Sequence, residues 1–224
     1  MRVLSHRLLQ DTGKPVTYEE SPNKSGVITP RFLVIHYTAG RSLDSSVAWF
    51  KQKQAKASAH LVIGRNGDLV QMVPFNRKAW HAGRSSWNGV DGLNTHSVGI
   101  ELDNAGELSR TEGGAWRAWF GETYKDKDVL TAPHRHDGPG AGASGWHVFT
   151  REQLDTLMEA AAALHDKYGF EAVLGHDDIA PRRKRDPGPA FPMGALRARL
   201  FGREEDEGEP GAANCDACGR LLAE

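Results

Sequence analysis

The sequence predicts an α/β protein in which a central mixed β-sheet is flanked by α-helices. Three observations support this fold class. A short apolar run at residues 32–35 leads into His36 and a loop-forming Ala-Gly pair, as expected of a buried strand. Residues 60–73 have the pattern of a β-hairpin, and a long amphipathic helix follows Thr150. Strands that alternate with helices, together with a hairpin, are typical of a mixed sheet.

The first half of the chain supplies one helix and three more strands. Ser42 or Asp44 can cap a helix over residues 45–53. The hairpin comprises strands 60–63 and 69–73, joined by a turn at Asn66-Gly67, a dipeptide favoured in tight hairpin turns. The apolar segment 97–102 predicts another buried strand.

The second half begins with a long segment, residues 104–149, in which no regular element is predicted. The stretch 133–145 is rich in Pro, Gly and His and predicts a loop. Long loops in compact domains often form lids or binding surfaces. Thr150 and Gln153 then form a capping box for a helix with apolar residues at helical spacing, namely Leu154, Leu157, Met158, Ala161, Leu164 and Tyr168. A final short strand over 172–175 leads into His176.

The composition is that of a soluble globular protein. The chain has 224 residues, 39% hydrophobic and 25% charged, enough for one good core. No stretch approaches the roughly 18 apolar residues of a membrane span, so we expect no membrane insertion. The first 15 residues lack the apolar block of a secretory signal, so we expect synthesis in the cytoplasm without a signal peptide. We also expect a monomer.

The net charge of −1 is unevenly distributed along the chain. Residues 1–202 hold 26 basic and 22 acidic residues, whereas residues 203–224 hold two and seven. The body has no concentrated basic patch, so we expect no binding of nucleic acid. The Glu, Gly and Pro content of the tail predicts disorder and places the end of the folded domain, 1–202, near Gly202. Cys215 and Cys218 form a single C-x-x-C, either reduced in a disordered terminus or part of a small metal clip.

Two predicted strands each end in a histidine, His36 in one and His176 in the other. Each could be a core residue satisfied by one hydrogen bond, or a metal ligand or base at the rim of the sheet. Asp186 stands ten positions after His176, in a loop restricted by several prolines. Two imidazoles and a carboxylate would make a catalytic zinc site with an open position. The spacing alone does not decide between these interpretations.

Six segments together resemble the zinc-dependent N-acetylmuramoyl-L-alanine amidases of the amidase-2 family. They are VIHYTAG (34–40), SAHLVIGRNGDLVQMVP (58–74), AWHAG (79–83), NTHSVGIELDNAG (94–106), FTREQ (149–153) and GHDDIAPRRKRDPGPAF (175–191). They follow the family's order and cover about residues 31–191. This family includes AmpD-type enzymes, phage lysozymes of the amidase type and peptidoglycan-recognition proteins. The last segment is most similar to the AmpD type, because it carries an aspartate where the others usually carry cysteine.

The resemblance implies a zinc cleft on one side of the sheet and one zinc ion per chain. By position, the ligands are His36, His176 and Asp186. Glu101 matches the acidic residue near the metal, a general acid and base, and Lys184 matches the lysine beside the reacting centre. The implied reaction is hydrolysis of the amide between N-acetylmuramic acid and L-alanine of the stem peptide, in peptidoglycan polymer or in muropeptides. The alternative is a non-catalytic peptidoglycan-binding recognition protein, a type that commonly lacks a zinc ligand.

Other residues in the matching segments are candidates for substrate binding, with packing as the alternative: His60, Trp80, His81 and Asn94. His134 and His136 are expected to be solvated. Segment 104–149 departs from the family pattern. Five of its aromatic residues either pack the loop onto the body or extend an open groove for glycan, namely Trp116, Trp119, Phe120, Tyr124 and Trp146. The lack of a visible signal is consistent with a cytoplasmic recycling enzyme and with a phage or prophage lysin that acts on the cell wall.

Overall fold

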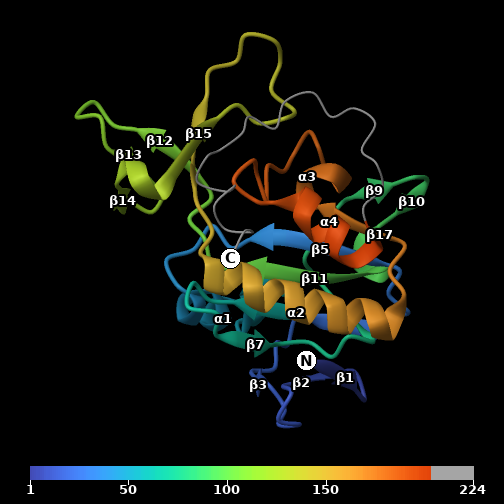
Figure 1. The fold of residues 1–224 in the computed structure, drawn as a ribbon. Coiled ribbons are helices and arrows are strands. Elements are labelled where there is room, and N and C mark those ends of the chain that lie inside the picture. The colour runs from blue at the N-terminus through green and yellow to red at the C-terminus, as the bar shows by residue number, and fades with distance from the viewer. Residues whose placement is uncertain (203–224) are drawn as a thin grey trace.

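The computed structural model describes residues 1–202 and contains a six-stranded mixed sheet, with strand order β17-β5-β11-β6-β7-β3 (Figure 1). The strands are β3 (Thr17–Tyr18), β5 (Phe32–Tyr37), β6 (Leu61–Ile63), β7 (Leu69–Gln71), β11 (Ser97–Leu102) and β17 (Ala172–Gly175). Neighbours from β17 through β6 are parallel, and β7 is antiparallel to β6. The predicted mixed sheet flanked by helices is confirmed, and the carboxyl ends of β17, β5, β11 and β6 meet at one edge.

Four α-helices accompany this sheet in the described residues: α1 (Leu43–Phe50), α2 (Arg151–Tyr168), α3 (His176–Ile179) and α4 (Met193–Phe201). Three short 3-10 helices cover Lys53–Ala55, Leu93–Thr95 and Asp126–Asp128. The capping box predicted for α2 is present, and the helix ends at Gly169 in the left-handed conformation. Helix α1 begins before the predicted residue 45 because Ser42 is its cap and accepts a hydrogen bond from the Ser45 amide.

The two faces of the sheet are distinguished by the alternation of side chains along its strands. In β5, Leu33 and Ile35 join the core cluster packed against α2, whereas Phe32 and Val34 join a second cluster on the other face. His36 continues the second series and therefore lies on the face opposite α2. In the neighbouring strand β11, Glu101 is paired in register with His36 and shares its face.

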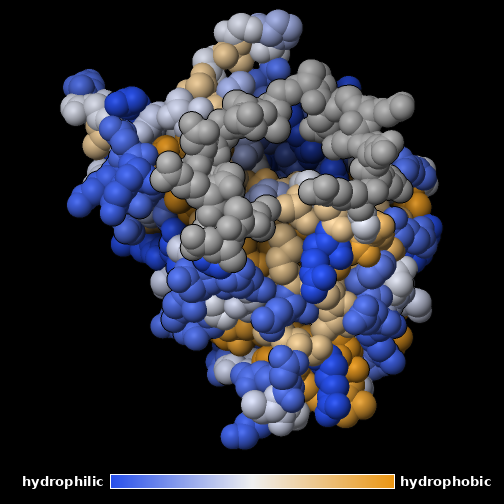
Figure 2. Space-filling model, in the orientation of Figure 1, coloured by the Kyte–Doolittle hydropathy of each residue, from blue (hydrophilic) through white to orange (hydrophobic). Residues whose placement is uncertain are grey.

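Segment 104–149 is not irregular, so that expectation was wrong. It forms a five-stranded antiparallel sheet in the order β14-β13-β12-β16-β15, which stands apart from the main sheet at the upper left of Figure 1. The strands are β12 (Glu107–Arg110), β13 (Trp116–Arg117), β14 (Thr123–Tyr124), β15 (Val129–Ala132) and β16 (Ser144–His147). Its small core is formed by Ala105, Leu108, Trp116 and Ala118, and its outer surface is largely hydrophilic (Figure 2). Strands of two to four residues are too short to produce a periodic pattern, which is why the sequence did not reveal them.

The remaining strands form three small antiparallel pairs. They are β1 (Arg2–Leu4) with β2 (Arg7–Leu9), β4 (Lys24–Val27) with β8 (Arg77–Ala79), and β9 (Ser86–Trp87) with β10 (Val90–Asp91). Within residues 1–202, no helix has the length and apolar character needed to cross a bilayer. The predictions for the acidic tail and for Cys215 and Cys218 lie outside the described residues.

Candidate active site

Three buried donor atoms converge at the carboxyl edge of the main sheet. His36 Nδ1 lies 2.9 Å from His176 Nδ1 and 2.9 Å from Asp186 Oδ2, and His176 Nδ1 lies 3.0 Å from Asp186 Oδ2. The parallel neighbours β5 and β17 bring the two histidines together, because their carboxyl ends share one edge. The loop after α3 returns Asp186 to them and is tied by a 2.9 Å bond from the Asp177 amide to the Asp186 carbonyl. This group could bind a metal ion.

Hydrogen bonds to the far side of the His176 ring select its tautomer. His176 Nε2 lies 3.1 Å from the Ala82 carbonyl oxygen, which only accepts. Arg183 Nη2 lies 3.4 Å from the same nitrogen, but its two hydrogens are donated to the Ala82 and Arg84 carbonyls at 2.8 and 2.9 Å. Nε2 of the neutral ring therefore carries the proton, which leaves the lone pair of Nδ1 directed at the donor group. A fixed tautomer of this kind is typical of metal-binding histidines.

A longer chain of hydrogen bonds has the same effect on His36. Ser97 Oγ donates to the Leu93 carbonyl at 2.6 Å, so it accepts from His81 Nε2 at 3.2 Å. Neutral His81 is then an acceptor at Nδ1, where it receives the Nε2 proton of His36 at 3.0 Å. The Nδ1 lone pair of His36 is left free for the donor group.

Gly99 makes room for this chain. It lies two residues before Glu101 on the same face of β11, and a Cβ atom there would clash with the His81 ring. The glycine within the buried strand therefore has a steric reason, since it lets the His81 ring lie directly against the β11 backbone.

The ionisation of His36 and Asp186 suits a metal ion. Burial, together with the neighbouring His176, lowers the pKa of His36 to about 4, so its imidazole is neutral at pH 7. Burial alone would raise the pKa of Asp186, but the neighbouring His176 and His36 rings hold it well below its usual range. Neutral imidazoles and a carboxylate are the forms that bind zinc. Zinc ligands about 2.0–2.1 Å from a tetrahedral ion lie roughly 3.3–3.4 Å apart, so these donors need to separate by only a few tenths of an ångström.

Glu101 lies beside the donor group with one oxygen unpaired. Its Oε2 is inaccessible to solvent and has no hydrogen-bond partner among the described residues. Burial and the Asp186 charge raise the Glu101 pKa well above its usual value, and only the Lys184 charge opposes this shift. A buried carboxyl oxygen without a partner is costly, which indicates a role in binding or in proton transfer.

The donor group opens into a cleft of about 840 Å³. Its walls come from the loop after β5, from α1, from the turn between β13 and β14, and from the loop before Asp186. Predicted site residues that line the cleft are Trp80, His81, Glu101, His176, Lys184 and Asp186.

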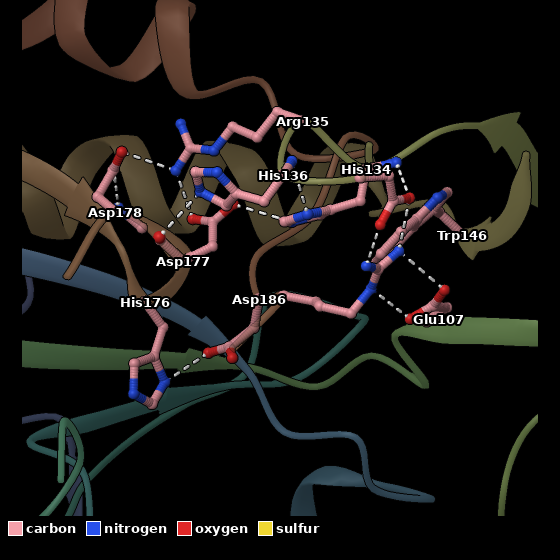
Figure 3. Close-up of polar contacts among 12 residues, drawn as sticks. Glu107, His134, Arg135, His136, Trp146, His176, Asp177, Asp178 and Asp186 are labelled. Atoms are coloured by element: carbon pink, nitrogen blue, oxygen red, sulfur yellow. Dashed lines mark hydrogen bonds and ion pairs between the residues drawn. The ribbon is translucent and has the colours of Figure 1, made fainter. Parts of the chain in front are cut away.

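The five-stranded sheet is connected to both ligand-bearing segments by charged contacts (Figure 3). Buried Asp177, next to His176, accepts hydrogen bonds from His134 Nε2 at 3.1 Å and from Arg135 at 2.7 Å. Arg185, next to Asp186, forms ion pairs with Asp137 at 2.5 Å and with Glu107 at 2.7 Å. Segment 104–149 thus contacts Asp177 and Arg185, the residues next to the donors His176 and Asp186.

Comparison with known protein families identifies the family of this chain. The family model Amidase_2, N-acetylmuramoyl-L-alanine amidase, matches residues 26–189, which include every residue described above as part of the donor group or its supports. The chain belongs to this family.

Individual relatives agree with this assignment. The chain is 34% identical over 185 residues to N-acetylmuramoyl-L-alanine amidase AmiD of Escherichia coli, covering 79% of this chain and 55% of AmiD. It is 33% identical to 1,6-anhydro-N-acetylmuramyl-L-alanine amidase AmpD of Salmonella typhimurium, covering 64% and 57%. The structure of E. coli AmiD in complex with anhydro-N-acetylmuramic acid-L-Ala-D-gamma-Glu-L-Lys is similar, with a TM-score of 0.58, 30% identity, and coverage of 87% and 66%. The chain thus spans little more than half the length of these curated relatives.

In this member of the Amidase_2 family, two predicted substrate-binding residues occupy supporting positions. His60 is fully buried, and its ring nitrogens bond to the Arg77 carbonyl and the Gly99 amide. Asn94 Oδ1 accepts hydrogen bonds from the amides of His81 and Ala82, and so fixes the turn that carries them. These contacts favour a packing role for both residues over the expected contact with substrate.

Several residues around the donor group were missed or misjudged from the sequence. His134 was expected to be solvated but is buried against Asp177, because the five-stranded sheet folds it back onto α3. His136 is exposed, as expected, although its Nε2 contacts the Asp177 carbonyl. Ser97, Asp177 and Arg185 were not singled out. Asp177 and Arg185 adjoin predicted ligands, which could have directed attention to them, whereas nothing in the sequence distinguishes Ser97.

Proposed function

We propose that the protein is a zinc-dependent N-acetylmuramoyl-L-alanine amidase that hydrolyses the amide between the lactyl group of N-acetylmuramic acid and L-alanine of the stem peptide. The observation that carries this proposal is the convergence of His36, His176 and Asp186 beside the unpaired oxygen of Glu101. His176, Asp186 and Glu101 line an open cleft. Two imidazoles and one carboxylate with an accessible side are the donor set of a catalytic zinc site.

The relatives support the choice of substrate. AmiD and AmpD are named as amidases of muramyl-L-alanine compounds, and the AmiD complex contains an anhydromuramyl tripeptide. Because this chain covers only part of their length, its activity and substrate are proposed here by analogy. We expect one zinc ion per chain and a monomeric enzyme.

Each residue has a definite part in the proposed reaction. When bound, zinc lowers the pKa of a coordinated water to about 7 and polarises the substrate carbonyl. His36, His176 and Asp186 hold the ion. Glu101 takes a proton from the attacking water and delivers it to the leaving amide nitrogen, a role suited to a carboxyl group with a raised pKa. The Lys184 ammonium group, on the cleft wall, stabilises the negative charge that develops on the carbonyl oxygen.

The second candidate, a peptidoglycan-binding protein without catalysis, is less well supported. Binding alone requires neither a complete set of metal donors nor a glutamate beside them with a buried, unpaired oxygen. The intact donor set and Glu101 therefore favour the enzyme.

Metal analysis combined with a product assay tests the proposal. The purified protein should contain about one zinc ion, release L-alanine-bearing stem peptide from a muropeptide, lose this activity in chelator, and regain it when zinc is added. His36→Ala should lose zinc and activity together, whereas Ser21→Ala, a buried serine outside the cleft, should retain both. Full activity in chelator would refute the metal mechanism, and binding of muropeptide without release of stem peptide would favour the recognition protein.

The biological role is a separate proposal with two versions, cytoplasmic recycling of muropeptides and lysis of the cell wall as an endolysin. Initial rates on purified sacculi and on a monomeric muropeptide distinguish them. A preference for the muropeptide by orders of magnitude assigns the protein to recycling, and efficient cleavage of sacculi assigns it to a bacteriolytic role.

A further inference from the structure

The aromatic residues of segment 104–149 divide into two groups with different environments. Trp116 is buried in the small core of the five-stranded sheet, and Trp146 is buried against His134 and Gly188. Trp119 and Phe120, in the turn between β13 and β14, instead line the cleft that contains the donor group. Packing within the protein therefore accounts for Trp116 and Trp146. It does not explain why Trp119 and Phe120 line the cleft.

Trp119 is exposed and yet held in place. Its side chain is 80% exposed, but its indole Nε1 donates a 2.7 Å hydrogen bond to the Ala39 carbonyl, and its ring meets Phe120 edge to face at 5.7 Å. Arg41 fastens the same turn, since its guanidinium lies 5.4 Å from the centre of the Phe120 ring and donates to the Phe120 carbonyl at 3.0 Å. A large apolar ring fixed in water is preorganised to bind a ligand, because little side-chain entropy remains to be lost.

A second exposed indole lines the same cleft. Trp49, on α1, is 48% exposed. The described residues include few large apolar side chains this exposed, and two of them lie on this one cleft. Exposed apolar surface concentrated at a cleft marks a binding site.

Sugar rings match this surface. The faces of a pyranose ring carry C–H groups that stack on an indole, while its hydroxyl groups remain available to water and to polar residues such as Arg41 and Ser45, which also line the cleft. The donor group needs only the lactyl carbonyl of one muramic acid residue, so the aromatic residues of the cleft walls are free to contact neighbouring sugars.

We propose that Trp119 and Trp49 form a glycan-binding platform, which holds sugar rings of the peptidoglycan strand that adjoin the muramic acid residue being processed. The inference rests on the proposed amidase function and adds to it a preference for polymeric glycan. Because Trp119 belongs to the inserted five-stranded sheet, that sheet supplies the preference.

The test compares two substrates with identical stem peptides, a single-disaccharide muropeptide and glycan chains of several disaccharides. Trp119→Ala and Trp49→Ala should each raise KM on the chains by about fivefold to tenfold, the loss expected for one stacking contact, with kcat little changed. Their kcat/KM on the muropeptide should stay within about twofold of the unmodified protein. Trp119→Phe keeps an aromatic face but loses the bond to Ala39, and should fall between.

The matched control is Phe201→Ala, which removes an exposed aromatic residue outside the cleft and should leave both substrates unaffected. If Trp119→Ala prefers glycan chains over the muropeptide as strongly as the unmodified protein does, the proposed platform is wrong. Equal losses on both substrates would also overturn it, because the indole would then contact the shared muramic acid or stem peptide.

A binding assay separates this inference from the amidase proposal. If the unmodified protein releases stem peptide from neither substrate, the amidase proposal fails. Co-sedimentation of chelator-treated protein with purified sacculi still tests the glycan-binding platform in that case. A several-fold smaller bound fraction for Trp119→Ala than for Phe201→Ala supports it, and equal fractions refute it.

Discussion

Ser97 should control zinc affinity although it contacts no ligand of the ion. In Ser97→Ala, the Nε2 proton of His81 loses its acceptor, and a buried donor left unpaired costs about 1–3 kcal/mol. His81 can escape this cost by moving its proton to Nδ1, but that proton then faces the Nε2 proton of His36. His36 must in turn move its own proton to Nδ1, the atom that faces His176 and Asp186.

Zinc binding to this variant must reverse these proton shifts. We therefore expect the zinc Kd of Ser97→Ala to rise by about 10- to 100-fold, the range typical of residues that orient a metal ligand, or about 1.4–2.7 kcal/mol. Competition with a chromophoric chelator at pH 7 measures this Kd directly. Activity at saturating zinc should recover most of its original value, because the ligands themselves are intact.

Two variants control for loss of a buried hydroxyl. Ser21→Ala removes a fully buried hydroxyl group that bonds to the Phe50 carbonyl, and should leave the zinc Kd unchanged. Ser97→Thr retains the hydroxyl and should recover part of the affinity. If Ser97→Ala binds zinc as tightly as Ser21→Ala, the hydrogen-bond chain does not set the tautomer of His36.

Three further predictions follow from the site. Glu101→Gln should keep its zinc but lose activity by about 10²–10⁴, as expected for a general acid and base, and near-normal turnover measured in zinc-replete protein would place the base elsewhere. Asp177→Asn removes a buried carboxylate that pairs with Arg135 and His134, so thermal denaturation should show a loss of about 1–3 kcal/mol in the free energy of unfolding. Arg151→Gln, at an exposed side chain of α2, is the control and should change this free energy by close to zero. Burial lowers the pKa of His60 to about 4 from 6.5, so between these values the unfolded chain binds a proton that the native protein does not. Stability of the zinc-free protein should therefore fall as pH drops from 6.5 to 4, by about 3 kcal/mol from His60 alone, and a flat urea-unfolding profile over this range would contradict it.

The sequence by itself determined the fold class and the family, because both depend on local signals. The apolar strands around His36 and Glu101, the Asn-Gly hairpin and the Thr150 capping box each require only residues close together in the chain. Two candidate donors, His36 and His176, stand at the exits of recognisable strands, and the resemblance of six local segments to the amidase-2 family then implied that these histidines and Asp186 are the ligands.

Only the tertiary structure decided how the site is supported. The Ser97–His81–His36 chain joins residues far apart in sequence, and its direction depends on the Ser97 hydroxyl donating to the Leu93 carbonyl. The burial of His134 and the exposure of Trp119 depend on a sheet whose strands are too short to give a periodic signal. Hydrogen-bond partners and side-chain exposure arise from long-range packing, and no local pattern encodes them.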